Sequence, residues 1–356
     1  STTDSRCVFE AWWPDGTLEV STGADVRIRG RSSEGFPKHQ YGMEFVNDAG
    51  EPTSAELFGM GSEGDWVLNG MWIDRAMFRN KLAFDVFREL GGGNDWAPES
   101  VYVELTIDGD YVGLYLLNET VDRDRSRLDI AEDDGTGQSF IVAASEDGIY
   151  SNVQYGRWEI DYPTEVTGAV QRGVEARLAA WEAEITGRGD PFTEMDLDSF
   201  VRFVLVEEFV KNNDGYYLSH RVYAHPDGYL HMVPWDLDLS LGQPSYNDNE
   251  NPYSWIAYRP AIVADSANDA FHQRFSEMWA EAREGTLATD AVIGRQEALR
   301  AHMGEAIDRN WSRWNIEDVD FSGYLYRVSS PEEEYARVAT WTEARLDWMD
   351  AAVESY

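Results

Sequence analysis

The first third of the chain alternates short apolar runs with turn residues. Runs at 8–13 (VFEAWW), 24–30 (ADVRIRG) and 101–107 (VYVELTI) are rich in β-branched and aromatic residues. The last run is followed by Asp108-Gly109-Asp110 and a second such run, and Asp-Gly between two β-rich runs is a strong hairpin signal. This pattern predicts antiparallel strands over most of residues 8–120.

One helix interrupts these strands. Apolar residues recur at helical spacing from Phe78 to Leu90, Asp74 can cap the start of the helix, and Gly91 can end it. We expect this helix to lie on the N-terminal sheet.

From about residue 165 the apolar positions recur with a helical period. This pattern predicts helices at 168–185, 196–212, 268–285, 289–314 and from 330 onward. A non-helical insert at 212–242 separates the second of these from the third, and Pro226-Asp227-Gly228 predicts a hairpin within it. Strands followed by helices predict an α+β fold, with a sheet-rich N-terminal lobe at 1–122 and a mainly helical C-terminal lobe at 123–356 that together form one unit.

Charge narrows the class of partner. The chain has 29 basic and 66 acidic residues, which give a net charge of −37. A surface of this sign repels phosphate backbones and anionic headgroups, so we expect no nucleic-acid partner. No apolar run approaches the roughly 20 residues of a spanning helix, and no signal segment opens the sequence, so we expect no membrane insertion.

Three residue types are informative because they are scarce. Cys7 is the single cysteine, which excludes an internal disulfide and zinc motifs of paired cysteines. Lysine occurs only at Lys38, Lys81 and Lys211, and each of these is therefore a better candidate for a specific role than a lysine usually is. The predicted hairpin carries three histidines, His220, His225 and His231. Because their spacing mixes odd and even, we expect them to divide between two faces and not to form a metal site.

The chemically densest segment is the insert at 212–242. Asn212 and Asp214 directly follow an apolar helix, and Asp236 and Asp238 stand in the sequence PWDLDLSLG. Two carboxylates at i and i+2 on an extended chain point the same way and can hold hard cations through oxygen ligands. With a third carboxylate brought close by the hairpin, phosphoryl transfer has what it needs, one aspartate to orient a hydroxyl and others to hold Mg²⁺. The alternative is that Asp236 and Asp238 only cap a turn.

The N-terminal lobe offers a second set of candidates. Arg29, Ser32, Ser33 and Lys38 lie in or beside a predicted turn whose amides and lysine can face an anion. Glu119 ends the strand YVGLYLLNE, and it either pairs with a basic residue in the cleft between lobes or is an edge-strand glutamate in water.

In order along the chain, these segments resemble the CotH kinase family, which is found widely in bacterial surface and secreted proteins. The resemblance covers nearly the whole chain and is carried by RIRGRSSEGFPKHQYGMEF, DWVLNGMWIDRAMFRNKLAFDVFRELG, the hairpin strands ending in LLNETVDRDRSRLDI, and SFVRFVLVEEFVKNNDGYY to VPWDLDLSLG. The family resembles protein kinases in fold but lacks H-R-D and D-F-G signatures, as this chain does. The resemblance implies an atypical protein-kinase-like fold in which the internal hairpin carries the site.

The resemblance also assigns roles in the C-terminal lobe. It implies that Asp214 is the catalytic aspartate, after Asn212, and that Asp236 is the principal Mg²⁺ ligand with Asp238 beside it. Five residues after Asp214, where kinases place a metal-binding Asn, the chain has Ser219. A hydroxyl is a weaker Mg²⁺ ligand, so Asn212 or Asp238 is expected to complete the coordination.

In the N-terminal lobe, Lys38 is similar to the phosphate-contacting lysine. Arg29, Ser32 and Ser33 lie in the same matching segment and are expected to help bind the nucleotide. Glu119 and the residues just after it are expected near the nucleotide base.

Two classes of function follow. The first is an ATP- and Mg²⁺-dependent kinase for hydroxyl groups of secreted or surface proteins, or a close variant that transfers the nucleotidyl group. The second is a non-catalytic envelope or binding module whose acidic cleft holds Ca²⁺ or a partner. By family analogy we expect a bacterial protein that is secreted or on the cell surface. The net charge favours neutral or basic acceptors, and the sequence leaves the oligomeric state open.

Overall fold

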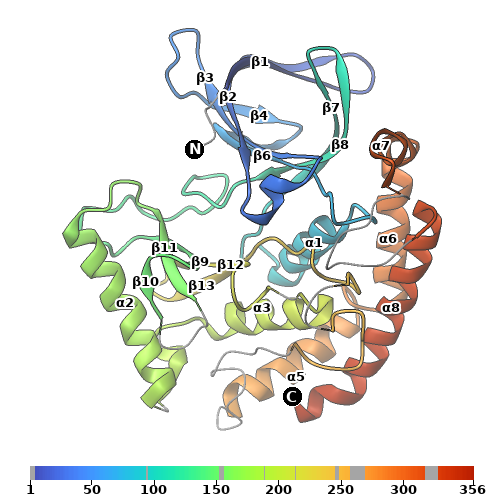
Figure 1. Cartoon of the computed structure of the whole chain (residues 1–356). Helices are drawn as coiled ribbons and strands as arrows, with labels where there is room; N and C mark the ends of the chain where they lie inside the picture. The colour runs from blue at the N-terminus through green and yellow to red at the C-terminus, as the bar shows by residue number, and fades with distance from the viewer. Residues whose placement is uncertain are drawn as a thin grey trace. The chain divides into compact units, whose positions relative to one another are not determined.

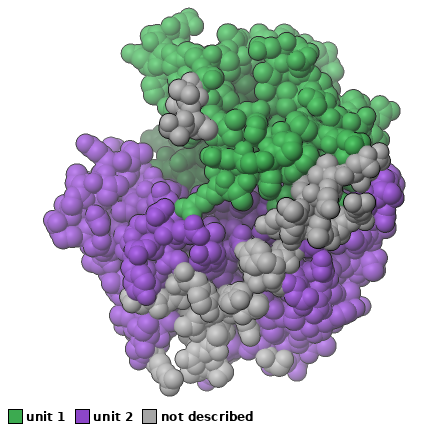
Figure 2. Space-filling model, viewed as in Figure 1, with its two compact units in different colours: residues 1–77, 98–129, 300–319 green, residues 78–97, 130–299, 320–356 purple. Residues whose placement is uncertain are grey.

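The computed structural model describes residues 5–93, 95–151, 156–187, 189–212, 214–244, 248–256, 269–316 and 328–356. The chain divides into two compact units, which Figure 2 shows in different colours. Unit 1 contains residues 1–77, 98–129 and 300–319, and unit 2 contains residues 78–97, 130–299 and 320–356. Both strands and helices are present in large numbers, so the fold is α+β as predicted.

Unit 1 contains a six-stranded antiparallel sheet (Figure 1). Its strand order is β1 (Ser5–Trp12), β2 (Leu18–Arg29), β3 (Gln40–Val46), β6 (Asp65–Asn69), β8 (Asp110–Glu119) and β7 (Ser100–Ile107). A short pair, β4 (Ala55–Leu57) and β5 (Met60–Glu63), forms separately. The predicted hairpin at Asp108-Gly109 joins β7 to β8, and both residues take the positive φ that such a turn requires.

One face of this sheet forms the core of unit 1. Phe45, Trp66, Tyr115 and Leu117 alternate with residues of the other face along β3, β6 and β8, and each is almost fully buried. Burying a large apolar side chain contributes about 1.5–3 kcal/mol, so this cluster supplies much of the driving force for folding of the unit.

A helix from far along the chain completes unit 1. Helix α7 (Ala306–Trp314) packs on β8, where Asn310 Oδ1 accepts a hydrogen bond from the Leu114 N–H at 3.1 Å. Trp314 Nε1 donates to the Val112 carbonyl at 2.8 Å. Gly113 lies between these contacts with φ +136°, and a Cβ there would overlap Asn310 Oδ1. The close approach of α7 to β8 therefore requires glycine at position 113.

Unit 2 combines a five-stranded antiparallel sheet with helices. The strand order is β10 (Ile149–Tyr150), β11 (Arg157–Tyr162), β9 (Ile141–Ser145), β12 (His220–Ala224) and β13 (Leu230–Pro234). The helices are α1 (Arg79–Gly91), α2 (Gly168–Gly187), α3 (Leu197–Val210), α5 (Asp269–Arg283), α6 (Thr289–Met303) and α8 (Pro331–Ala352). Single 3₁₀ turns occur at η1 (Ser32–Gly35) in unit 1 and at η2 (Pro191–Thr193) and η4 (Val353–Ser355) in unit 2. The predicted helix at 289–314 is divided into α6 and α7 at Gly304, which has a positive φ.

Helix α3 is the centre of unit 2. It is apolar on all sides, and from Ser199 to Val210 every residue is buried. Strand β13 and helices α1, α5 and α8 pack against it (Figure 1). Helix α1 therefore belongs to unit 2, although we expected it to form part of the N-terminal lobe. Among the described helices, none is both long and apolar enough to cross a membrane.

Candidate functional site at the β12–β13 hairpin

Asp214 lies in a tight turn that follows α3. The helix ends at Lys211, which adopts a left-handed conformation with φ +51° and caps the helix through its N–H. The Asp214 carbonyl then accepts N–H donors from Tyr217, Leu218 and Ser219 at 2.9, 3.0 and 3.2 Å. Because one carbonyl closes the whole turn, the backbone at Asp214 is held tightly, while its side chain is partly exposed.

The pairing of β12 with β13 brings the Asp214 turn beside Asp236. His220 is paired with Pro234, and the N–H of Trp235 donates to the carbonyl of Ser219 at 3.1 Å. The backbone of Ser219 is thus bonded on one side to Asp214 and on the other to the residue before Asp236. A hairpin of about fifteen residues therefore brings together the backbones near two aspartates that are distant in sequence.

In the segment after β13, the leucines are buried and the aspartates are at least partly exposed. Leu237 and Leu239 are buried, whereas Asp236 is exposed and Asp238 is partly exposed. Asn80 of α1, itself buried, accepts the Leu237 N–H at 2.6 Å and fixes the segment. Asp236 has φ +54°, a left-handed backbone conformation that is uncommon outside glycine and is often found at functional sites.

The donor set fits a hard divalent cation. Asp236 and Asp238 offer accessible carboxylate oxygens, and Ser219 offers a hydroxyl on the neighbouring backbone, which is the ligand chemistry of Mg²⁺ and Ca²⁺. Within the described residues, however, neither Asp236 nor Asp238 belongs to a group of three His, Cys, Asp or Glu side chains with ligand atoms inside 4.8 Å of one another. Their roles as metal ligands stay a prediction.

Glu207 is a buried acid beside Asp214 that the sequence analysis missed. Burial raises the pKa of Glu207 well above its ordinary value, the charges of Glu208 and Asp214 act in the same direction, and Asn212 opposes them. The neutral form of Glu207 is therefore favoured, and its carboxyl packs directly against Gly215. Asn212 is fully buried next to it. The sequence does contain a signal for this buried acid, because Glu207 and Glu208 are consecutive glutamates within an otherwise largely apolar helix.

Lys38 is bonded inside unit 1. Its Nζ donates to the Leu114 carbonyl and to Asn310 Oδ1, the latter at 2.8 Å, and lies 4.5 Å from the centre of the Tyr115 ring. Burial lowers the pKa of Lys38 well below its ordinary value. A phosphate contact by Lys38 requires these bonds to be exchanged, and that role stays a prediction.

The other predicted nucleotide-binding residues of unit 1 differ in solvent exposure. Arg29 is the last residue of β2, and Ser32 and Ser33 lie in η1, where Ser32 is exposed. Glu119 is buried on the interior strand β8, and its Oε2 accepts the Glu99 N–H at 2.8 Å. The alternative of an edge-strand glutamate in water is therefore wrong.

The two remaining lysines hold local structure. Lys81 pairs with Asp85 one turn later in α1, at 3.0 Å. Lys211 Nζ donates to the carbonyls of Asp248 and Asn251, each at 2.7 Å, which ties residues 248–254 to the end of α3. Burial lowers the pKa of Lys211 to about 8, and the charge of Arg345 acts in the same direction.

His220 links the pH of the solution to the stability of this region. It is buried between the rings of Trp158 and Phe203, and its Nδ1 lies 2.9 Å from the Gly215 carbonyl in the Asp214 turn. Burial lowers the pKa of His220 to about 4, although the bond to Gly215 opposes this shift.

Below pH 6.5 the unfolded chain protonates His220 while the folded chain does not until about pH 4. Because of this difference, we expect His220 to lower the free energy of unfolding by about 3 kcal/mol as the pH falls from 6.5 to 4. Urea unfolding of the wild type and of His220→Gln between pH 7 and pH 4 checks this. The measured quantity is the change in the free energy of unfolding with pH, which is expected to be larger in the wild type than in His220→Gln. Equal changes in the two proteins would contradict the prediction.

Comparison with known proteins now places the chain. The protein-family model described as CotH kinase protein matches residues 26–349, so the chain belongs to the CotH kinase family. One curated relative is the inner spore coat protein H of Bacillus subtilis (strain 168), which is 21% identical over 240 residues. The alignment covers 63% of this chain and 60% of that protein. The resemblance described from the sequence is confirmed at the level of the family.

Proposed function

We propose that this chain is an atypical kinase with a protein-kinase-like fold, which transfers the γ-phosphate of ATP to hydroxyl groups of secreted or surface proteins. The observation that carries the proposal is the hairpin register, in which Ser219 is bonded both to Asp214 and to the residue before Asp236. An aspartate that orients a hydroxyl must lie close to the carboxylates that hold the metal–phosphate complex, and this register supplies that proximity.

In this mechanism Asp214 accepts a hydrogen bond from the acceptor hydroxyl and aims its oxygen at the γ-phosphorus. That oxygen bonds to phosphorus, the bond from phosphorus to the bridging oxygen breaks, ADP leaves, and the hydroxyl proton passes to Asp214. Asp236 and Asp238, with Ser219 or Asn212, would hold Mg²⁺, which would neutralise charge on the phosphates.

The location of the protein is part of the same proposal. The curated relative is an inner spore coat protein by name, and we propose a coat, surface or secreted location for this chain as well. The net charge of −37 attracts basic acceptor segments and repels acidic ones. We therefore propose hydroxyl acceptors within neutral or basic segments.

A thermal-shift titration tests the nucleotide site. We expect Mg²⁺–ATP to raise the melting temperature of the wild type, because binding to the folded chain alone adds about 2.7 kcal/mol at a hundredfold excess over Kd. Asp236→Ala removes an exposed carboxylate and is expected to abolish this rise, which is measured in each protein relative to its own melting temperature without ligand. Asp147→Ala, which removes an exposed aspartate elsewhere in unit 2, is the control and is expected to behave as the wild type.

Two outcomes of this titration would contradict the proposal. A rise of the same size in Asp236→Ala would remove Asp236 from the site. No rise with Mg²⁺–ATP in any of the three proteins, together with a rise in Ca²⁺ alone, would overturn the kinase proposal in favour of a cation-binding module, the class that the acidic surface also suits.

A further inference from the structure

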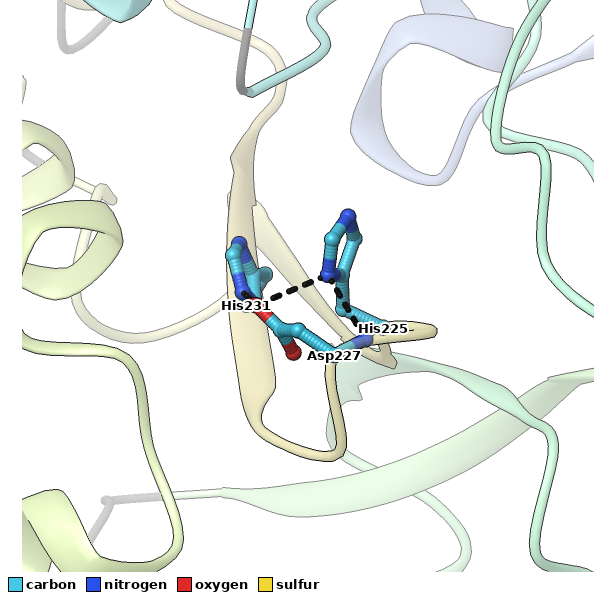
Figure 3. Close-up of side chains that lie close together, drawn as sticks. All are labelled: His225, Asp227 and His231. Atoms are coloured by element: carbon cyan, nitrogen blue, oxygen red, sulfur yellow. Dashed lines mark hydrogen bonds and ion pairs between the residues drawn. The ribbon is translucent and has the colours of Figure 1, made fainter.

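The tip of the β12–β13 hairpin gathers three metal-ligating side chains (Figure 3). Asp227 Oδ2 lies 2.9 Å from His225 Nδ1 and 2.9 Å from His231 Nε2. The two imidazole rings are tilted toward each other with centres 4.1 Å apart. Among the described residues, this is the one group of three His, Cys, Asp or Glu side chains with ligand atoms within 4.8 Å of one another.

The hairpin register produces this cluster. Tyr223 is paired with His231, and the His225 N–H donates to the Tyr229 carbonyl at 2.9 Å. His225 and His231 are therefore diagonal neighbours on one face, where cross-strand side chains meet, and the turn brings Asp227 over them. His220 lies on the opposite face. The three histidines therefore divide between two faces as predicted, with His225 and His231 together on one of them.

A buried layer behind His231 offers a carboxylate as acceptor for its Nδ1–H. His231 Nδ1 lies 2.8 Å from Asp95 Oδ1, and Asp95 also forms an ion pair with Arg202 of α3. All three residues are more than nine-tenths buried. A carboxylate that accepts the Nδ1–H of a histidine leaves Nε2 with a lone pair, and metal-binding histidines are held in this way.

We propose that His225 Nδ1, Asp227 Oδ2 and His231 Nε2 bind one Zn²⁺-type transition-metal ion, with a fourth position open to water. In a tetrahedral site with ligand bonds of about 2.0–2.1 Å, neighbouring ligand atoms lie about 3.3 Å apart. The two distances of 2.9 Å therefore need to open by only a few tenths of an ångström. The side chains of His225 and Asp227 are 31% and 38% exposed, so an ion and a water molecule can reach the site.

Binding changes the local hydrogen bonds in a defined way. The backbone N–H of Asp227 lies 3.3 Å from His225 Nδ1 and donates to its lone pair. In the metal-bound form this lone pair is given to the ion, and the amide turns to solvent. The bond between His231 and Asp95 is kept.

This site differs in metal preference from the proposed nucleotide site. Two imidazole nitrogens favour Zn²⁺, Cu²⁺ or Ni²⁺ over Mg²⁺, whereas Asp236, Asp238 and Ser219 offer oxygen alone. The proposal therefore does not depend on kinase activity, and each site can fail its own test separately.

Calorimetric titration of the chelator-treated full chain with Zn²⁺ tests the proposal, in the presence of excess Mg²⁺ to occupy acidic surface groups. We expect one Zn²⁺ per chain in the wild type. His225→Ala and Asp227→Asn alter exposed groups at a turn, and each is expected to lose this binding. Asp95→Asn is expected to weaken it by about 10–100-fold, as is usual when the hydrogen-bond partner of a ligating histidine is lost.

His302→Ala is the matched control, because it removes an exposed histidine on α6. It is expected to bind Zn²⁺ as the wild type does, and melting curves in chelator are expected to show that His225→Ala remains folded. Co²⁺ added to the wild type is expected to give the visible absorption of a tetrahedral site. Equal Zn²⁺ binding by the wild type, His225→Ala and Asp227→Asn, or no binding by a folded wild type, would overturn the proposal.

Discussion

Glu334→Ala is expected to lower the free energy of unfolding by about 3–5 kcal/mol, because it leaves the buried guanidinium of Arg79 without its carboxylate. The two side chains are completely buried and lie 2.8 Å apart. Burial by itself raises the pKa of Glu334, but Arg79 and Arg337 outweigh it and hold this pKa below its ordinary value. Glu334 is therefore ionised, and its loss leaves a buried charge uncompensated.

Arg79 also connects three parts of unit 2. It lies at the start of α1, pairs with Glu334 of α8, and donates through Nε to the Ser240 carbonyl at 2.8 Å. Ser240 comes two residues after Asp238. Without Glu334, Arg79 is expected to hold the Ser240 carbonyl less firmly. Glu334→Ala is therefore expected to make the segment with Asp236 and Asp238 less ordered, in addition to lowering global stability.

Urea unfolding monitored by tryptophan fluorescence measures this effect. Arg337→Ala is the control, because Arg337 bonds to the same carboxylate but is 28% exposed, and exposed pairs are worth at most about 1 kcal/mol. A loss below about 1 kcal/mol in Glu334→Ala, or equal losses in both variants, would contradict the argument.

Asp214→Asn is expected to reduce phosphate transfer by about 10²–10⁴-fold, the usual contribution of a positioned proton acceptor. Asparagine keeps the shape of the side chain and cannot take up the hydroxyl proton. The Asp214 backbone carbonyl, which accepts three N–H donors of the turn, is unchanged in this variant, so we expect the variant to fold as the wild type does.

The assay uses ATP labelled at the γ-phosphate and a library of serine- and threonine-containing peptides that range from acidic to basic. Mass spectrometry of the products separates phosphate transfer from nucleotidyl transfer. The thermal shift with Mg²⁺–ATP is expected to survive in Asp214→Asn, in contrast to Asp236→Ala. Full turnover by a folded Asp214→Asn protein would exclude Asp214 as the catalytic aspartate.

Local patterns predicted those parts of the fold in which neighbouring residues in the sequence determine the structure. The Asp108-Gly109 turn and its two strands form as expected, because the turn chemistry and the β-rich runs agree. Helix α8 also forms where the helical period predicts it, and its N-cap Ser330 accepts the Glu333 N–H. The hairpin around Asp227 also forms where the turn residues predict it.

Pairings over long sequence distances were not predictable in the same way. Residues 141–145 form the strand β9, which pairs with β12 about 80 residues later, and nothing in their local pattern reveals that partner. The burial of Lys38 likewise depends on Asn310, which is 272 residues away. The His225–Asp227–His231 cluster was missed because only the histidines were considered as ligands, whereas the turn places Asp227 against both His225 and His231.

Helix α7 finally has a consequence for how the protein is made. The last strand of the unit 1 sheet ends at Glu119, yet the amide of Leu114 donates to Asn310, and Lys38 Nζ donates to Asn310 as well as to the Leu114 carbonyl. A ribosome that has translated this sequence through residue 129 has made every strand of the sheet, whereas Asn310 follows Leu114 only 196 residues later. Neither unit is a continuous piece of sequence, so no simple truncation isolates one of them, and a fragment designed to end after the last strand of the sheet would lack the helix that completes it.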